Sequence, residues 1–359
     1  KNPHLQSFLV GGMATPVDPD KQASLNIHTI AQFKKLIAGA QEFVSKVYIP
    51  DLLAVASFYK DWAGYGAGVG NYMVYGEYPL DDEANPELYI KPGIIRARDI
   101  SKVEEFDPSK ITEQITHSWY DYAGGEEAAL HPSAGETKPN YTGPEPPYER
   151  LDTSKKYSWL KSPRYEGVPM EVGPLSRMLV NYVRGHEQVQ GLVNHVLKTL
   201  GVGPEALFST LGRVAARGIE TQLLVDKIGD WVDELADNMG KGELRIHDNS
   251  KWEPESWPAD CMGAGFHEAP RGSLGHWVHV KNAKIERYQC VVPSTWNAGP
   301  RDSGDVPGPY EAALVGTPVA DPEQPIEILR TVHSFDPCMA CGVHVVEPGG
   351  REITRVKAR

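Results

Sequence analysis

The segment Asp336-Pro-Cys-Met-Ala-Cys-Gly-Val-His344, near the C-terminus, carries the sharpest chemical signal in this 359-residue chain. Two thiolates separated by two residues can hold one soft metal ion from a single tight turn. A c-type haem site needs histidine directly after the second cysteine, where Gly342 stands, and a zinc ribbon needs a second Cys-x-x-Cys. A thioredoxin-like redox pair needs a strand-then-helix context that is missing here, so two incidental buried thiols are the remaining alternative. The residues alone predict half of a metal site.

Composition and charge limit the other classes of function. The chain is 40% hydrophobic and 23% charged, which is typical of a globular protein. Its net charge of −12 argues against a nucleic-acid partner, because phosphate backbones are bound by clustered Lys and Arg. The longest apolar run, residues 52–59, is shorter than the roughly 18 to 20 residues that cross a bilayer. The start at Lys1 lacks both Met and a signal sequence, so we expect an incomplete or processed chain.

Apolar periodicity predicts an α+β protein that is mainly α-helical, with a helical-bundle core, small antiparallel β elements and a single entangled domain. Apolar residues recur at three-and-four spacing in the predicted helices, whereas the strands are short alternating runs. We expect helices at 27–47 (closed by Pro50), 52–62, 175–200 and 204–239, strands at 72–75 and 88–91, a hairpin at 277–292, and loops at 130–150 and 294–325.

Several further segments resemble the nickel–iron hydrogenase large subunits, and in particular the C-terminal portion of the membrane-bound uptake type. The resemblance rests on the Asp-Pro-Cys-x-x-Cys-x-x-His motif together with segments in the same order along nearly the whole chain. These segments are Asn2–Gly12, His117–Tyr120, Pro163–Gly167, Glu171–Arg177, Glu268–Gly272 with Leu274 and His276-Trp277, and Cys290–Asn297 with Pro300–Asp302. The resemblance implies the hydrogenase large-subunit fold.

The resemblance also implies a nickel–iron centre whose iron carries carbon monoxide and cyanide. Cys338 would be a terminal nickel ligand and Cys341 would bridge nickel and iron. Arg271 would lie over the open coordination position, with the Asp336 carboxylate beside it. Pro270, Pro293 and Ser294 would line the pocket of the diatomic ligands, with the Ser294 hydroxyl donating to a cyanide nitrogen.

Two more features follow from the resemblance alone. His344 and the backbone carbonyl of Cys290 would bind Mg²⁺, although magnesium generally prefers oxygen ligands. A maturation endopeptidase would cut between His344 and Val345 after nickel insertion by dedicated factors, which would remove an exposed polar extension at residues 345–359. Cys261 is expected to be an ordinary buried thiol.

The implied function is reversible heterolytic oxidation of dihydrogen, with electrons passed to an iron–sulfur small subunit. The complex would lie on the periplasmic side of the cytoplasmic membrane, bound to a membrane cytochrome b. The sequence lacks the N-terminal Cys-x-x-Cys of the family, so we expect a fragment or one part of a subunit split into two polypeptides. In either case this chain alone is expected to bind no nickel–iron centre and to reduce no dye with hydrogen. The alternatives are a non-catalytic scaffold, as in respiratory complex I, and a small zinc-binding interaction protein.

Overall fold

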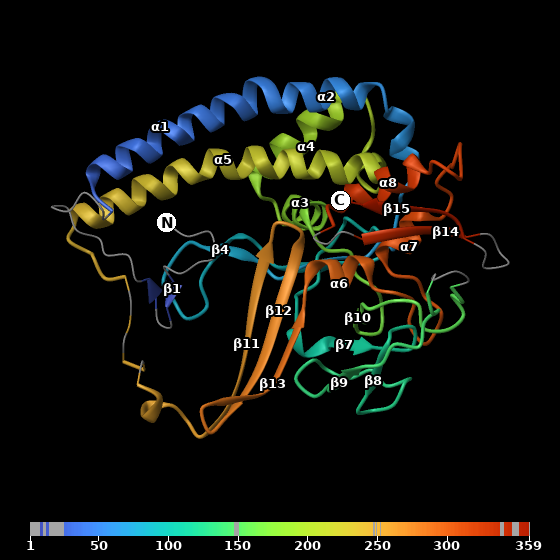
Figure 1. The fold of residues 1–359 in the computed structure, drawn as a ribbon. Helices are drawn as coiled ribbons and strands as arrows, with labels where there is room; N and C mark the ends of the chain where they lie inside the picture. Colours follow the sequence, from blue (N-terminus) through green and yellow to red (C-terminus); the bar gives the residue numbers. More distant parts are fainter. Residues whose placement is uncertain are drawn as a thin grey trace.

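A computed structural model describes residues 8–9, 12–13, 25–146, 151–246, 248, 250–251, 253–337, 341–346 and 352–358. Side chains are described for residues 25–337, apart from the gaps in that range, and for Ile353. Within these residues no helix is both long and apolar enough to cross a membrane. Helices form one layer of the molecule and a set of small antiparallel sheets lies beneath it (Figure 1).

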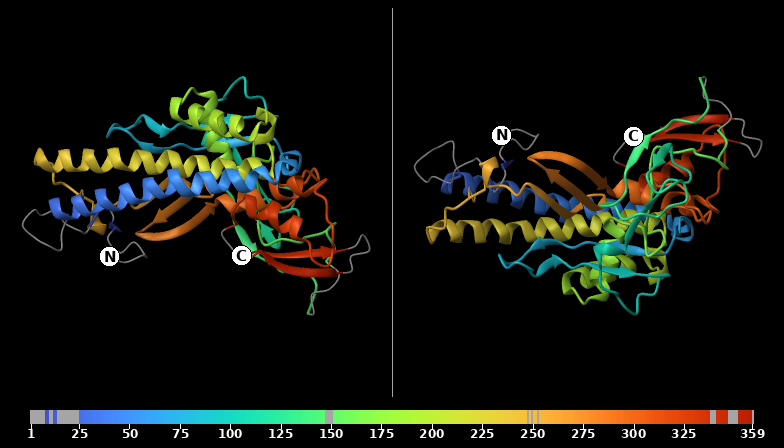
Figure 2. Two further views of the ribbon diagram at one scale, coloured as in Figure 1. Left: turned by 90° about the horizontal axis from the view of Figure 1, so that it is seen from above. Right: turned by 90° about the horizontal axis from the view of Figure 1, so that it is seen from below.

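Two long antiparallel helices, α1 (Ile27–Phe43) and α5 (Thr210–Gly240), lie side by side along the helical layer (Figures 1 and 2). Each begins at a residue whose side chain accepts from free backbone N–H groups: Asn26 accepts from His28 and Thr29, and Ser209 accepts from Gly212. Such caps satisfy donors that have no partner within the first turn. Local sequence therefore fixes where each of the two helices begins.

The first predicted helix does not end at Pro50, so that prediction was wrong. A π-helical turn (Val44–Tyr48) follows α1 and leads directly into α2 (Ile49–Ser57). Pro50 occupies the first turn of α2, where a missing N–H costs least, and the wider π turn keeps the chain helical before it. The Leu52–Trp62 segment then ends in a 3₁₀ turn at Lys60–Gly64.

The predicted helix at 175–200 is instead two helices, α3 (Pro174–Val183) and α4 (Glu187–Leu200). Gly185 lies between them with φ +80, a backbone conformation that glycine adopts without strain. Both helices pack on α5, which follows a 3₁₀ turn at Pro204–Leu207. Their shared core contains Leu175, Leu179, Val193, Val196 and Leu223, all of them buried.

A three-stranded antiparallel sheet projects away from the helices (Figure 1). It consists of β11 (Asp260–Ala269), β12 (Gly272–Lys281) and β13 (Lys284–Val291). The predicted hairpin is β12 and β13, joined by Asn282 and Ala283 with φ 51 and 58, the left-handed values that a tight hairpin turn needs. Strand β11 was not predicted because nearly all of its residues are exposed, so it lacks the alternation of a half-buried strand.

The remaining strands form two-stranded antiparallel ribbons, with short helices between them. Both predicted short strands are present, as β3 and β5, whereas the predicted loops contain one strand and two short helices. The ribbons are β1 (Phe8–Leu9) with β2 (Gly12–Met13), β3 (Tyr72–Val74) with β6 (Gly93–Ile95), β4 (Glu77–Pro79) with β5 (Leu88–Ile90), β7 (Ile111–Gln114) with β10 (Ser162–Tyr165), β8 (Tyr120–Tyr122) with β9 (Thr137–Pro139), and β14 (Cys341–Val346) with β15 (Glu352–Ala358). The short helices are α6 (Pro293–Ala298), α7 (Pro309–Leu314), α8 (Ile326–Ser334) and the 3₁₀ turns Pro108–Lys110 and Pro254–Ser256.

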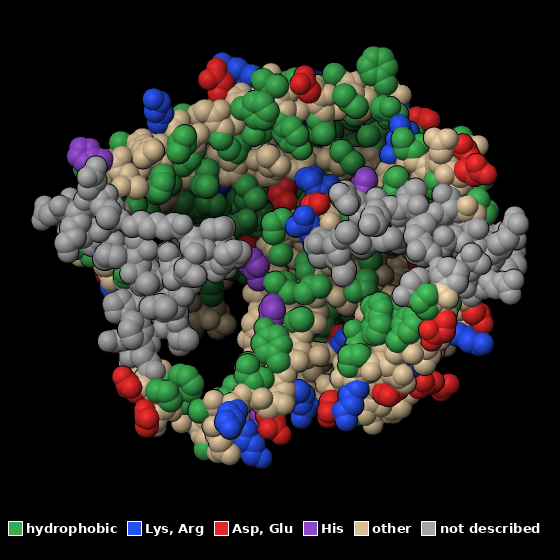
Figure 3. All heavy atoms as spheres, viewed as in Figure 1, with side chains coloured by type: hydrophobic (Ala, Val, Ile, Leu, Met, Phe, Trp, Pro, Cys, Tyr) green, Lys and Arg blue, Asp and Glu red, His purple; other side chains and the backbone are tan. Residues whose placement is uncertain are grey.

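A second core joins these ribbons to the projecting sheet. Trp296 of α6 and Met73 of β3 are fully buried in it, together with Trp277 of β12. The predicted α+β class with a helical core and small antiparallel sheets is therefore confirmed. Hydrophobic side chains also gather over α1 and α5 on the face seen in Figure 3. Phe33 and Leu36 of α1 are among the exposed hydrophobic side chains of the chain.

Candidate metal centre

Arg271 and Asp336 lie together at the base of the projecting sheet, although they are 65 residues apart in the chain. Arg271 belongs to the two-residue turn between β11 and β12, because Ala269 pairs with Gly272. Its Nε donates to the backbone carbonyl of Asp336 at 2.9 Å, and its Nη2 lies 3.4 Å from Asp336 Oδ1. The side chains are 37% and 38% exposed, so the pair is only partly buried.

The backbone at Asp336 directs the chain into the cysteine motif. Asp336 follows the end of α8 and adopts φ 55, a left-handed conformation that Asp tolerates better than most residues. Cys338 lies outside the described residues. Cys341, His344 and Val345 are described by backbone only, in β14, where Cys341 pairs with Ala358 and His344 pairs with Arg355. The predicted thiolate and imidazole ligands therefore stay predictions. Asp336 and Pro337 are the residues of the motif whose side chains the structure describes.

Two arginines of α5 hold the segment that leads to Asp336. Arg213 makes two hydrogen bonds with the buried Glu171 carboxylate, at 2.7 and 2.8 Å. The Arg213 guanidinium also stacks on Phe335, with Cζ 3.9 Å from the ring centroid. Arg217 donates to the Ser334 carbonyl at 3.1 Å, and its Nε lies 3.9 Å from Asp336 Oδ2. One helix face therefore sets the position of residues 334–336.

Replacing Arg213 with methionine is expected to lower the free energy of unfolding by about 3–5 kcal/mol, because it leaves the buried Glu171 carboxylate without its cation. Chemical denaturation followed by tryptophan fluorescence measures the change. Lys46→Met is the matched control, since it breaks an exposed ion pair with Glu42 and should change stability little. If both substitutions changed the free energy of unfolding equally, Arg213 could not be the cation that stabilises the buried Glu171 carboxylate.

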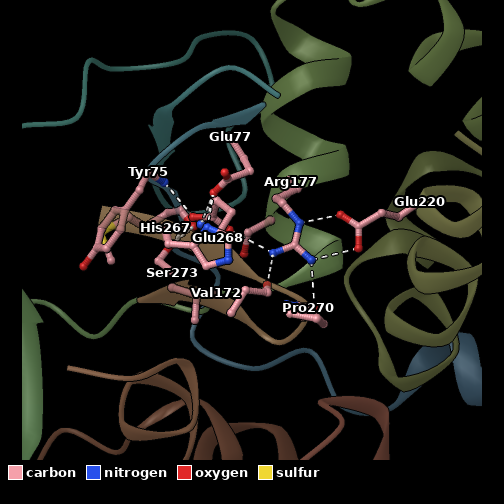
Figure 4. A network of polar contacts seen from close by, with 12 residues as sticks. Tyr75, Glu77, Val172, Arg177, Glu220, His267, Glu268, Pro270 and Ser273 are labelled. Carbon is pink, nitrogen blue, oxygen red and sulfur yellow. Dashed lines mark hydrogen bonds and ion pairs between the residues drawn. The ribbon is translucent and has the colours of Figure 1, made fainter. Parts of the chain in front are cut away.

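The other side of the Arg271 turn is held by a buried cluster of Arg177, Glu220, Glu268 and Ser273, called the Arg177 cluster below (Figure 4). Arg177, from α3, lies between the two carboxylates and contacts both. Glu268 also accepts from the Tyr75 N–H at 2.7 Å and from the Ser273 hydroxyl. Burial raises the pKa of the Glu268 carboxyl, and the positive charge of Arg177 opposes this rise.

A second polar cluster lies next to Cys290, the residue whose carbonyl was predicted to bind Mg²⁺. Lys161 Nζ and Gln289 Nε2 each donate to Glu113 Oε2 at 2.7 Å, while the buried Glu113 Oε1 has no hydrogen-bond partner among the described residues. Burial raises the pKa of the Cys290 thiol, an effect that Lys161 opposes and Glu113 reinforces. An unpaired buried carboxylate oxygen beside this strand fits the oxygen chemistry that magnesium prefers.

The remaining predicted pocket residues lie in α6 and in the β11–β12 turn. Pro293 and Ser294 form the buried first turn of α6. The Pro270 carbonyl accepts from Arg177 Nη2 at 2.9 Å. Sequence reasoning missed Arg177, Arg217, Glu220 and Glu113 as parts of the site, and the available signal was charge within otherwise apolar helix or strand segments. Cys261, predicted to be a buried thiol, is partly exposed in β11.

An apolar cavity of about 550 Å³ lies elsewhere, between α1, α2, α5 and α8. Its lining includes Phe43, Leu52, Trp62 and Leu211, and it contains neither Arg271 nor Asp336. The cavity is therefore separate from the candidate centre, which instead sits where the β11–β12 turn meets the end of α8.

The chain matches the family model described as nickel-dependent hydrogenase over residues 1–344. It is 43% identical to the uptake hydrogenase large subunit of Rhizobium leguminosarum bv. viciae and 39% identical to the hydrogenase-1 large chain of Escherichia coli. Each alignment covers 100% of this chain and 62% of the relative, so the chain spans less than two thirds of their length.

Solved structures agree with the sequence relatives. The reduced, active Ni-Fe-Se hydrogenase of Desulfomicrobium baculatum matches with a TM-score of 0.77 and 32% identity, over 94% of this chain and 63% of that one. The Ni-Fe-Se hydrogenase of D. vulgaris Hildenborough in the reduced state matches with a TM-score of 0.75 and 32% identity, over 94% and 64%. The large-subunit fold is thus shared across the described elements. The chain belongs to the nickel-dependent hydrogenase family.

Proposed function

We propose that this chain is the part of a nickel–iron hydrogenase large subunit that supplies two thiolates and the active-site arginine for heterolytic cleavage of dihydrogen. The hydrogen bond from Arg271 to the Asp336 carbonyl carries the proposal. It places a permanently charged guanidinium beside the residue that stands two positions before Cys338. The family match across residues 1–344 supports the same assignment.

The donor set of the motif fits the metals. Cys338 and Cys341 would hold the nickel–iron centre, because thiolates are the soft ligands that these metals take. When bound, the centre supplies an open coordination position at which dihydrogen is split. The chain contains one Cys-x-x-Cys, so in this proposal the other thiolates come from another part of the assembled protein.

Arg271 and Asp336 would line the space over the open coordination position. The Nε hydrogen bond and the Nη2 contact with the carboxylate fix the plane of the guanidinium before substrate arrives. A preorganised charge stabilises developing charge without a reorganisation cost. The Asp336 carboxylate keeps the Arg271 cation in place.

The diatomic ligands and magnesium belong to the same proposal. Pro270, Pro293 and Ser294 would line the carbon monoxide and cyanide pocket, with the Ser294 hydroxyl as a donor to cyanide. His344 and the Cys290 carbonyl would bind Mg²⁺. Glu113 Oε1, near Cys290, has no hydrogen-bond partner in the part of the chain that the structure describes. It supports the magnesium site, because a buried oxygen without a partner is costly unless a cation or water satisfies it.

Family membership supports a small-subunit partner, and the other partners are part of the same proposal. An iron–sulfur small subunit would receive the electrons, and a membrane cytochrome b would take them onward at the periplasmic side of the cytoplasmic membrane. Nickel-insertion factors and an endopeptidase would complete maturation. The names of the matched uptake hydrogenase large subunits support a multisubunit uptake enzyme.

Metal analysis together with hydrogen-dependent dye reduction tests the function in the assembled protein carrying this chain. Nickel and iron with dye reduction are expected. An intact, metal-free protein without activity would favour the scaffold alternative, which the retained Cys338, Cys341 and Arg271 argue against. Zinc in place of nickel and iron would favour the interaction-protein alternative.

We expect maturation to cut the chain between His344 and Val345, so intact-mass spectrometry of the mature subunit should find His344 as its last residue. The family match ends at residue 344, which supports this boundary. In the backbone this bond lies within β14, where Val345 pairs with Thr354 of β15. Release of residues 345–359 after the cut therefore requires β15 to separate from β14. A mature protein that ends at Arg359 would contradict the proposal.

A further inference from the structure

We propose that Arg177 is a positioning residue for Arg271, holding the turn that carries it; this inference rests on the proposed function. Arg177 Nη1 donates to the Ala269 carbonyl and Nη2 donates to the Pro270 carbonyl, both at 2.9 Å. These are the two residues immediately before Arg271. The Arg177 guanidinium, which extends from α3, therefore hydrogen-bonds the backbone of the turn that carries the Arg271 side chain.

Every N–H group of the Arg177 guanidinium donates a hydrogen bond. Nε and Nη2 donate to the two oxygens of Glu220, and Nη1 donates to Glu268 at 2.8 Å. Together with the two carbonyls this gives a partner to each of the five N–H donors of a guanidinium. The side chain is 4% exposed, so water cannot replace a lost partner easily. Lysine, with three donors, cannot reproduce this arrangement.

Close backbone packing holds the opposite side of the turn. Gly272 has φ +132, and a Cβ there would lie 2.6 Å from Val172 Cγ2 and 2.7 Å from Gly173 N. A Cβ on Gly173, with φ +126, would lie 2.9 Å from the Arg271 carbonyl oxygen. Gly173 precedes α3, and its carbonyl accepts from the Arg177 N–H. The start of α3 therefore contacts the turn through its backbone and through the Arg177 side chain.

Helix α5 contacts both Arg177, which holds the turn, and the backbone just before Asp336. Glu220 of α5 bonds Arg177, and Arg217 of the same helix bonds the Ser334 carbonyl beside Asp336. The two residues are three apart and hence on one helix face. A shift of the turn relative to α5 would change the distance between Arg271 and Asp336, which is the geometry on which the proposed function depends.

A double-mutant cycle in the assembled hydrogenase carrying this chain tests the inference. Arg177→Lys is expected to lower kcat for hydrogen oxidation by about 10- to 100-fold, with KM for hydrogen nearly unchanged, because a misplacement of about 1 Å has costs of this size. If Arg177 acts through Arg271, the same substitution made in an Arg271→Lys background should cause little further loss. Glu220→Gln, which keeps Arg177 but weakens its hold, should give a smaller loss with the same dependence on Arg271.

Arg164→Lys is the matched control, since Arg164 is fully buried and paired with Asp302 but has no hydrogen bond or ion pair to residues 269–272 among its described contacts. Its effect on kcat should be the same in both backgrounds. Equal effects of Arg177→Lys in both backgrounds would overturn the inference. If Arg177→Lys does not fold, Glu220→Gln decides, because independence from Arg271 would overturn the inference equally. An inactive, correctly metallated wild-type protein would instead overturn the proposed function.

Discussion

Replacing Arg271 with lysine is expected to lower kcat for hydrogen oxidation by about 100- to 1000-fold, the usual cost of removing a preorganised charged donor from an active site. Arg271 reaches the Asp336 carbonyl through Nε and the carboxylate through Nη2, so one planar group makes both contacts. A lysine ammonium keeps the charge but loses the planar fork that orients it. The measurement is steady-state hydrogen-dependent dye reduction by the assembled enzyme, normalised to nickel content.

Arg287→Lys provides the control for this prediction. Arg287 lies on β13 of the same sheet and donates to the Ser133 carbonyl at 2.8 Å, away from Asp336. Its replacement should leave kcat per nickel nearly unchanged. If Arg271→Lys kept more than half of the wild-type kcat, the guanidinium could not have the role that its position indicates.

Replacing Cys341 with serine should reduce bound nickel and iron to background, and with them all hydrogen oxidation. A serine hydroxyl stays protonated at neutral pH and is a hard ligand, so it cannot replace the soft thiolate that the proposal assigns to Cys341. Inductively coupled plasma mass spectrometry of the purified protein measures both metals. Arg271→Lys should differ from Cys341→Ser, because it should lose activity but retain both metals.

Two other cysteines of the chain supply controls for the metal measurement. Cys261→Ser alters a partly exposed thiol of β11, and Cys290→Ser alters a thiol while keeping the backbone carbonyl that is proposed to bind magnesium. Both variants should retain nickel and iron. Full nickel occupancy in Cys341→Ser, or its loss in Cys261→Ser, would contradict the assignment of the motif.

The fold was predictable from sequence where periodicity and burial agree. The long helix α5 and the β12–β13 hairpin follow apolar patterns closely, and the structure contains both. Pro50 was misread because a local rule ends helices before proline, whereas the π turn at Val44–Tyr48 lets this helix continue. Strand β11 has almost no buried face, so its pairing with β12 depends on contacts that single-sequence patterns do not contain.

The candidate site was predictable only in part for a similar reason. The spacing of Cys338 and Cys341 predicts only half of a metal site, and their nickel and iron roles were implied by family resemblance. The approach of Arg271 to Asp336 spans 65 residues and was also implied by the resemblance alone. Arg213, Arg217 and Glu220 recur at spacings of four and three in residues 211–220 of α5, where the other residues are Leu, Gly, Val, Ala and Ile. That pattern places three charges on one helix face, yet only the structure shows Glu171, Ser334 and Arg177 as their partners.

Isotope exchange between dihydrogen and solvent tests heterolytic cleavage at this site most directly, because it needs neither an electron acceptor nor a particular direction of turnover. The assembled, metallated enzyme is incubated with H₂ in D₂O, and the gas phase is followed by mass spectrometry. We predict steady formation of HD, which falls about 100-fold or more in Arg271→Lys. An enzyme with full nickel and iron that forms no HD would contradict the account.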